Sequence, residues 1–200
     1  MFTLFAARQT IAVASHIALE DSGLPYQITW IDFAKGEQTG PDYLAINPKG
    51  RVPALVTDQG TLTETPAILE YIAGVSGQMM PDDPFERAKV RECMAYCAST
   101  FHVNHAHKLR GSRWSDDPAA HTSMRAKVPD TMAASCAYID GQLTGDWWVS
   151  SYSVADIHLY AICRWLAGDG VDIATYPHLK AHFDRMQTRP ATQSVEAAHG

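Results

Sequence analysis

Glu64 and Thr65 stand directly before Pro66, at the point where an apolar helical pattern begins. Thr65 would offer a hydroxyl and unpaired backbone N–H groups at a helix N-terminus, which suits a carboxylate. The adjacent Glu64 carboxylate would pair with an ammonium group. Together the two residues suit the α-amino-acid end of a ligand. A helix N-cap beside a solvated acid is the simpler alternative.

The segment Asn47–Leu55 (NPKGRVPAL) places Pro53 at the head of a predicted strand. Proline is tolerated there, and a cis peptide bond is also compatible with the position. A cis bond would turn the backbone N–H and C=O of Val52 outward, where an extended peptide ligand could pair with them as another strand does. The alternative is a trans proline that opens an edge strand.

A polar cluster of His102, His105, His107 and Lys108 falls late in a predicted helix. His102 and His105 share a helix face, but His107 does not, so the spacing argues against a metal site. We therefore predict no metal cofactor.

The composition of the 200 residues is that of a globular protein, with 46% apolar and 19% charged residues and a net charge of -6. No basic surplus exists to neutralise phosphates, which argues against nucleic acid or an anionic membrane as a partner. No apolar run reaches the roughly 18 residues of a membrane span, and the N-terminus shows no signal peptide. We expect a cytoplasmic protein with buried free thiols at Cys93, Cys97, Cys136 and Cys163.

The first eighty residues alternate β-like and helical runs. Strands are predicted at Phe2–Ala6, Tyr26–Phe33, Val52–Thr57 and Thr61–Thr63, and helices at Thr10–Ser22 and Thr65–Gly74. Asp58-Gln59-Gly60 indicates a hairpin between the last two strands. The order β-α-β followed by β-β-α predicts an α/β domain, a four-stranded mixed sheet with helices on both faces.

The remainder of the chain has a helical pattern. A segment rich in Gly, Pro and Asp (Gly74–Pro84) reads as a linker. Four helices are predicted, at about 85–112, 118–143, 153–168 and 176–187. The third begins with a capping box at Ser153–Asp156. We thus predict a first domain at 1–76, a linker at 77–84 and an all-α domain at 85–200.

Taken in order and at these distances, the motifs resemble those of the glutathione S-transferase family, most closely its bacterial beta class, over nearly the whole chain. The matching pieces are Val13–Ile17 with Ser22-Gly23, Asp42-Tyr43, Asn47–Leu55, Glu64-Thr65 and Ser153–Asp156. The resemblance implies a thioredoxin-like N-terminal domain, an all-α C-terminal domain, bound glutathione and a homodimer.

The resemblance also implies roles for individual residues. The cis-proline of the family is matched by Pro53, and its backbone partner by Val52. The acidic and hydroxyl pair that holds the γ-glutamyl end is matched by Glu64 and Thr65. The lysine that approaches the glycyl carboxylate is matched by Lys35.

The second domain of the family contributes further groups to glutathione binding. A histidine of its first helix is matched by His102, with Ser99 one turn before it. Ala95 stands where the beta class has an asparagine.

The catalytic position departs from the family pattern. Ile11 stands where the beta class has its cysteine, and Phe5, Ala6 and Ala7 occupy the region where other classes have a tyrosine. A thiol with a pKa of about 8.5 needs hydrogen-bond donors or a helix N-terminus to become a thiolate at neutral pH. Thr10 is the nearest hydroxyl and is the catalytic candidate, with an ordinary N-cap as the alternative.

These features favour a glutathione transferase that conjugates the thiolate of glutathione, its substrate, to small apolar electrophiles. A glutathione- or ligand-binding dimeric module with little turnover is the second hypothesis, favoured by the missing cysteine and tyrosine. Met94, Tyr96, Trp114 and Trp165 would line a pocket for the second substrate or simply pack in the core.

Overall fold

The computed structural model describes all 200 residues and divides into two compact units. We call Met1–Met80 with Gln187–Gly200 the sheet unit, and Pro81–Met186 the helical unit. Each unit is described by itself below.

The sheet unit contains a four-stranded mixed sheet in the order β2-β1-β3-β4. Its strands are β1 (Phe2–Ala6), β2 (Tyr26–Trp30), β3 (Ala54–Thr57) and β4 (Gly60–Thr63). Strand β1 pairs parallel with β2 and antiparallel with β3, and β3 pairs antiparallel with β4. Thr57 lies opposite Gly60, so the predicted hairpin has a two-residue turn. The predicted mixed sheet is confirmed.

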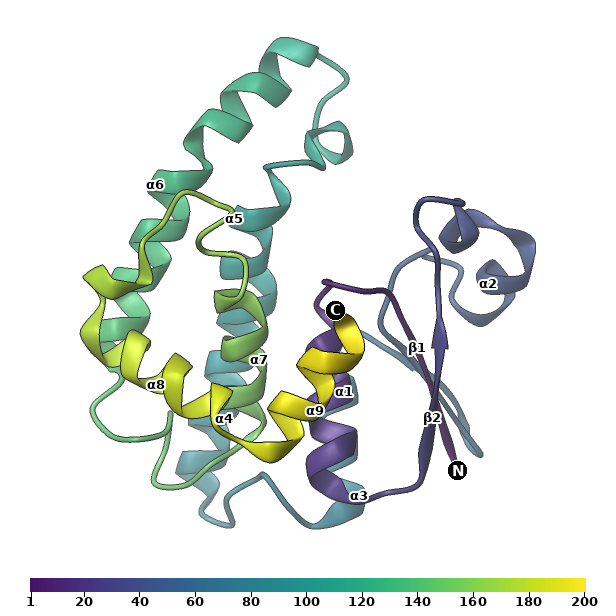
Figure 1. The fold of residues 1–200 in the computed structure, drawn as a ribbon, viewed down its shortest axis with the longest axis vertical. Coiled ribbons are helices and arrows are strands. Elements are labelled where there is room, and N and C mark those ends of the chain that lie inside the picture. The colour runs from purple at the N-terminus through teal and green to yellow at the C-terminus, as the bar shows by residue number, and fades with distance from the viewer. The chain divides into compact units, whose positions relative to one another are not determined.

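Helices cover both faces of this sheet (Figure 1). They are α1 (Ala12–Ser22), α2 (Pro41–Ile46) and α3 (Thr65–Ser76), with a 3₁₀ turn at Glu37–Thr39. Side chains alternate along a strand, so Leu4 and Ala6 of β1 are fully buried on one face, while Phe5 points to the other and contacts Tyr43 of α2. Helix α1 is apolar on nearly all sides and packs against both β1 and α3. Its burial fixes the loop that precedes it.

The C-terminal helix α9 (Pro190–His199) packs against α1, as Figure 1 also shows. Its last carbonyls accept hydrogen bonds from the loop before α1: Arg8 Nη1 donates to Ala198 O at 2.8 Å, and Gln9 Nε2 to Gly200 O at 2.7 Å. The contacts therefore group residues 187–200 with the sheet, whereas the sequence pattern placed them in the second domain. A helical pattern does not show which unit a terminal helix packs against.

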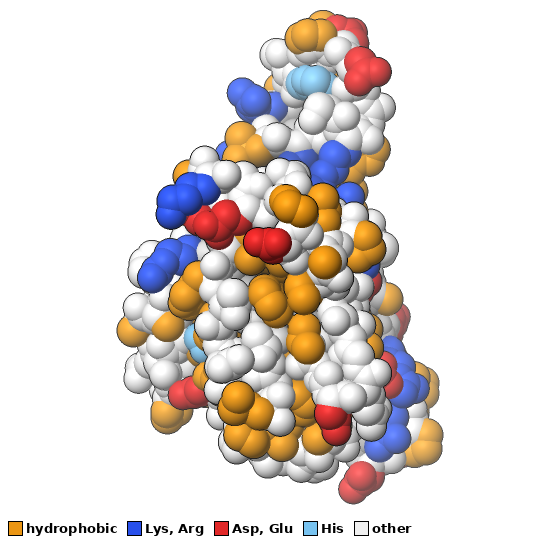
Figure 2. Space-filling view, turned by 90° about the vertical axis from the view of Figure 1, so that its right-hand side faces the viewer, with side chains coloured by type: hydrophobic (Ala, Val, Ile, Leu, Met, Phe, Trp, Pro, Cys, Tyr) orange, Lys and Arg blue, Asp and Glu red, His pale blue; other side chains and the backbone are white.

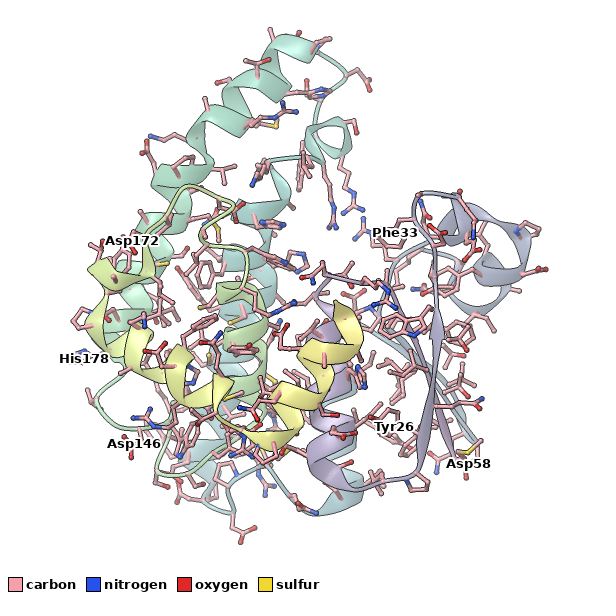
Figure 3. All side chains as sticks on the ribbon, viewed as in Figure 1. Tyr26, Phe33, Asp58, Asp146, Asp172 and His178 are labelled. Carbon is pink, nitrogen blue, oxygen red and sulfur yellow. The ribbon has the colours of Figure 1, made fainter.

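A buried polar network joins α1 to β2 and α9. His16 Nδ1 lies 3.2 Å from His199 Nε2, and His16 Nε2 lies 3.1 Å from the Tyr26 hydroxyl. Tyr26, labelled in Figure 3, donates its proton to Glu20, so it must accept from His16 Nε2–H. Burial lowers the pKa of His16 to about 4, although the nearby negative charge of Glu20 acts to raise it. His16 is therefore neutral, and its unprotonated Nδ1 accepts a hydrogen bond from His199 of α9. This bond ties α9 to α1.

The helical unit contains α4 (Pro84–Tyr96), α5 (His102–Ala106), α6 (Pro118–Gln142), α7 (Val154–Cys163) and α8 (Pro177–Gln187). Short helical turns lie at Gly111–Arg113 and Ile173–Thr175. The four predicted helical segments are present, but the first is interrupted by a π-helical turn at Cys97–Phe101. Every residue of α7 is buried, so this helix forms the centre of the unit. None of the helices is both long and apolar enough to cross a membrane.

The predicted capping box at the start of α7 is present. The Asp156 carboxylate is fully buried and accepts hydrogen bonds from Ser153 N–H (2.8 Å), Ser153 Oγ (3.0 Å), Trp148 N–H (2.8 Å) and His182 Nε2 (3.0 Å). A buried carboxylate is tolerated only when donors satisfy it in this way. Asp156 therefore ties α8 and the segment before α7 to the start of the buried helix.

The four cysteines are free and buried, as predicted. Burial raises the pKa of Cys93 and Cys163 well above the ordinary thiol value and that of Cys136 to about 12.

On the face seen in Figure 2, basic side chains occur in small groups interspersed with acidic ones. The chain as a whole carries a net charge of -6.

Candidate functional site

The loop before β3 is held by side chains from its own segment. The Arg51 carbonyl accepts hydrogen bonds from Tyr43 Oη and Asn47 Nδ2, both at 2.6 Å. Gly50 has a positive φ of 60°, and a Cβ there would lie 2.9 Å from a backbone oxygen, so only glycine fits. The Val52–Pro53 peptide bond is cis, as the resemblance implied. The backbone N–H and C=O of Val52 form no hydrogen bond within the chain.

The start of α3 places Glu64 and Thr65 beside this loop. Glu64 has a φ of 71°, a conformation that residues other than glycine rarely adopt, and Thr65 is buried at the first helical position. Lys49 pairs with the Glu64 carboxylate and donates to Thr63 Oγ1 at 2.7 Å. The Lys49–Glu64 pair was not predicted, because fifteen residues separate the partners and no periodicity relates them.

Lys35 lies in the exposed loop between β2 and α2. Its Nζ is 3.1 Å from the Asp32 carboxylate. This ion pair raises the pKa of Lys35 and lowers that of Asp32. Because 73% of the Lys35 side chain is exposed, the pairing leaves it accessible to another anion.

The start of α1 carries the catalytic candidate. Thr10 Oγ1 donates to the Ala7 carbonyl at 2.8 Å and accepts from the Ala12 N–H at 3.3 Å. Its single proton is therefore already used within the loop. Ile11, at the position of the beta-class cysteine, is buried. The other N–H groups of the first turn are also bonded within the chain, Val13 N–H to the Thr10 carbonyl and Ala14 N–H to the Ile11 carbonyl.

Ser99 and His102 lie in the helical unit, around the π-helical turn that follows α4. Ser99 is exposed within the turn, and the His102 ring lies 5.1 Å from the Trp165 ring. Wider π turns shift the angular positions of side chains and are frequent at functional sites. No sequence pattern indicated this turn.

The residues that the sequence offered for a second-substrate pocket do not form one cluster. Met94 is buried, and Tyr96 packs on Tyr138 with its hydroxyl bonded to Ser135. Trp114 stacks on His107, with ring centroids 4.2 Å apart. These contacts fit the core-packing alternative for Met94 and Tyr96.

The histidine cluster contains a pairing that the sequence did not indicate. His105 Nδ1 lies 2.7 Å from Asp169 Oδ2, and Lys108 Nζ lies 3.1 Å from Asp169 Oδ1. His107 instead contacts the Val103 carbonyl. No group of three or more metal-ligating side chains is suitably placed for a metal ion.

Comparison with known proteins agrees with this geometry. Residues 1–74 match the family profile "Glutathione S-transferase, N-terminal domain", and residues 105–190 match "Glutathione S-transferase, C-terminal domain". The chain is 30% identical to glutathione S-transferase GstA of Escherichia coli O157:H7, over 98% of both chains.

Solved structures are also similar to this chain. A glutathione transferase homologue from Sulfitobacter with bound glutathione has a TM-score of 0.95 and 46% identity, covering 99% of this chain and 98% of that one. The beta-class glutathione S-transferase of Sphingomonas chungbukensis has a TM-score of 0.85 and 31% identity, with the same coverage. Two family profiles and relatives matched over nearly their full length lead to one conclusion: this chain belongs to the glutathione S-transferase family.

Proposed function

We propose that this protein binds glutathione and conjugates its thiolate to small apolar electrophiles. The observation that carries the proposal is the Val52 loop beside the start of α3, where Glu64 and Thr65 present a carboxylate, a hydroxyl and helix N–H groups. Membership of the family and the bound glutathione in similar structures support the same ligand.

In this proposal Glu64 pairs with the ammonium of the γ-glutamyl group, and Thr65 with the helix N–H groups binds its carboxylate. Val52 pairs through its backbone with the cysteinyl residue, next to Pro53. Lys35 approaches the glycyl carboxylate. Lys49 screens and positions the Glu64 carboxylate, as their ion pair supports.

Ser99 and His102 of the helical unit complete the glutathione contacts, on the pattern that the beta class shows. Ser99 contributes a hydroxyl, and His102 contributes ring nitrogens that donate or accept. Ser99 lies within the π-helical turn and His102 directly follows it, which supports a shared role.

The thiolate lies near Thr10, where the positive end of the α1 dipole stabilises negative charge. The protein supplies orientation and thiolate stabilisation, and it forms no covalent intermediate. The Thr10 hydroxyl adds to this stabilisation only by giving up its bond to Ala7.

A binding module with little turnover is the second candidate, and a specific observation favours it. Each side chain at the start of α1 that carries a donor is engaged elsewhere: Thr10 with Ala7, Arg8 with Ala198 and Gln9 with Gly200. We further propose that the protein is a cytoplasmic homodimer.

One comparison separates the two candidates. Calorimetric titration with glutathione measures binding, and turnover of a chlorodinitrobenzene measures conjugation. Binding with turnover supports the transferase, and binding without turnover supports the module. If glutathione does not bind, both candidates are excluded.

A further inference from the structure

The last turn of α9 meets the loop that precedes α1 (Figure 1). Two consecutive side chains of this loop bind backbone carbonyls there. Arg8 Nη1 donates to Ala198 O at 2.8 Å, and Gln9 Nε2 donates to Gly200 O at 2.7 Å. The last carbonyls of a helix have no partner within the helix and carry the negative end of its dipole, so they suit a cation and an amide donor. Helix α9 therefore holds the loop from outside, within the sheet unit.

The backbone of Gln9 has a conformation that glutamine rarely adopts. Its φ of 57° lies in the left-handed region, where the side chain crowds the backbone. Such a conformation persists only where the surrounding structure fixes it, and it is frequent at functional sites. The hydrogen bond from the Gln9 amide to α9 is a contact of this fixing kind.

Helix α9 is itself fixed on the rest of the sheet unit. His199 is fully buried, its Nε2 lies 3.2 Å from His16 Nδ1, and its ring meets the Trp30 ring edge-on at 4.9 Å. Just before the first residue of the helix, Arg189 Nη2 donates to Asp21 at 3.0 Å. Because contacts at both ends hold α9 in place, its last carbonyls define the position of the loop that they bind.

The conformation of the loop determines where Thr10 lies. Thr10 Oγ1 donates to the Ala7 carbonyl at 2.8 Å, and only Arg8 and Gln9 stand between the two residues. Thr10 also accepts from the Ala12 N–H at 3.3 Å, so a change at Gln9 reaches the first turn of α1. A displacement of about 1 Å is enough to lose much of a catalytic contact.

We propose that Gln9 is a positioning residue, which holds the start of α1 through its hydrogen bond to α9 in the conformation that stabilises the glutathione thiolate. This proposal rests on the proposed function, in which the thiolate lies near Thr10. Gln9 acts through the loop and does not itself touch the thiolate. The groups assigned to the two ends of glutathione, Glu64, Thr65 and Lys35, lie on other segments and do not depend on Gln9.

Gln9→Met tests this role. Methionine has about the length of glutamine but no amide, so the loop loses its bond to α9 and the backbone relaxes to a negative φ. The pKa of the bound glutathione thiol is expected to rise, and kcat/KM for a chlorodinitrobenzene is expected to fall about tenfold. The Kd of S-methylglutathione, which has the same two ends but no ionisable thiol, is expected to stay unchanged. Ultraviolet absorbance of the thiolate measures the pKa, and calorimetric titration measures the Kd.

Gln9→Asn separates the backbone conformation from the amide bond. Asparagine adopts a positive φ more readily than most residues, but its shorter side chain takes the amide away from Gly200 O. This variant is expected to retain more of the thiolate and of the turnover than Gln9→Met. Equal losses in the two variants would show that the amide acts directly, which would overturn the positioning role.

His199→Phe tests the contribution of α9. It keeps a ring at this position and removes the hydrogen bond to His16, so the pKa of the bound thiol is expected to rise here as well. The double variant with Gln9→Met is expected to lose no more activity than Gln9→Met alone, because both changes act through one contact. Losses that multiply would show that α9 does not act through Gln9.

Ser194→Ala is the matched control on α9. It removes a hydrogen bond of 3.1 Å to Glu20 of α1, away from the loop, and is expected to leave the thiol pKa and turnover unchanged. Circular dichroism checks that each variant is folded. If His199→Phe does not fold, Gln9→Met and Gln9→Asn still decide the proposal.

The outcomes separate this proposal from the proposed function. An active wild type whose thiol pKa and turnover do not change in Gln9→Met would overturn the positioning role and leave the proposed function intact. A rise in the S-methylglutathione Kd that equals the loss in kcat/KM would also overturn it, because Gln9 would then support binding as a whole. A wild type that binds S-methylglutathione but neither ionises nor conjugates glutathione would exclude the transferase, and the role of Gln9 with it.

Discussion

Helix α7 of the helical unit and helix α1 of the sheet unit begin with different arrangements of polar groups. At the start of α7, the Asp156 carboxylate accepts from two atoms of Ser153, from Trp148 and from His182. The carboxylate is fully buried, and each of its donors comes from the chain. This helix start has no capacity left for a ligand, so it serves the fold.

At the start of α1 the polar side chains are fewer, and backbone carbonyls supply most of the acceptors. Thr10 Oγ1 accepts from Ala12 at 3.3 Å, longer than any of the bonds to Asp156, and the next residue is the buried Ile11. The next two N–H groups of the first turn, those of Val13 and Ala14, bond to the backbone carbonyls of Thr10 and Ile11. The comparison teaches that a filled helix start such as that of α7 is fixed by buried long-range bonds, whereas the start of α1 is closed by local bonds that an anion can replace only by breaking them.

The largest expected effect concerns the filled helix start. Asp156→Ala leaves four donors without this acceptor and is expected to lower the free energy of unfolding by about 3–5 kcal/mol. Asp172→Ala is the matched control. Asp172, labelled in Figure 3, caps only the short turn Ile173–Thr175 through Ala174 and is exposed, so its loss is expected to cost about 1 kcal/mol. Urea unfolding measures both values. Equal losses of unfolding free energy in the two variants would show that burial and the number of donors do not determine how much a capping carboxylate stabilises the protein.

The filled helix start was predictable only in part. Ser153 and Asp156 are three residues apart, so their reciprocal bonding follows from local spacing. The donors from Trp148 and His182 depend on tertiary packing, which no local pattern encodes. The hairpin and the strands of the mixed sheet were also predictable from local sequence. Turn residues indicate the hairpin, and runs of β-branched residues indicate the strands.

In the candidate site, too, short motifs were predictable from the sequence and long-range contacts were not. The Val52–Pro53 bond and the placement of Glu64 at a helix start follow from short motifs. The pairing of His105 with Asp169 joins residues 64 positions apart. Only folding brings these groups together, and neither flanking sequence carries a pattern that relates them. The hydrogen bond from Thr10 to Ala7 was equally hidden, since any helix start with a hydroxyl has the same sequence pattern.

The next prediction concerns a buried side chain without hydrogen-bond partners, in contrast to the fully bonded Asp156. His158 of α7 is buried, and neither of its ring nitrogens has a hydrogen-bond partner. Burial, aided by the charge of His102, lowers the pKa of His158 to about 3, against 6.5 when exposed. Between these values the unfolded chain binds more protons than the folded one, so stability falls as the pH falls.

We expect His158 to cost about 2 kcal/mol of stability between about pH 7 and pH 5. His158→Leu is expected to remove this part of the pH dependence, because the unfolded chain then has no proton to gain at this position. His178→Gln, which changes an exposed histidine labelled in Figure 3, is the control and is expected to retain it. Urea unfolding at a series of pH values measures the effect. An unaltered pH profile in His158→Leu would assign the dependence to other groups, such as His16.

A smaller effect is expected at the start of α3, where a charged group remains available to a ligand. Glu64→Gln removes the carboxylate that pairs with the ammonium of glutathione and is expected to raise the Kd about tenfold, or about 1.4 kcal/mol. Asp58→Asn, at the tip of the hairpin (Figure 3), removes a carboxylate from the same unit and is expected to leave the Kd unchanged. Calorimetric titration measures both. An equal rise in the two variants would indicate a general electrostatic effect rather than a contact with Glu64.

The smallest effect is expected at the start of α1 itself. Thr10→Val keeps the shape of the side chain and removes the hydroxyl, whose proton is already donated to Ala7. If the dipole of α1 stabilises the thiolate, kcat/KM for a chlorodinitrobenzene falls by less than about fivefold. If the hydroxyl is the main donor, the loss reaches about a hundredfold, as removal of a dedicated donor does. Thr10→Ser keeps the hydroxyl and is the control, expected to retain the rate. A large loss in Thr10→Val with full activity in Thr10→Ser would mean that the hydroxyl leaves Ala7 for the thiolate, so that the substrate replaces a bond within the helix start.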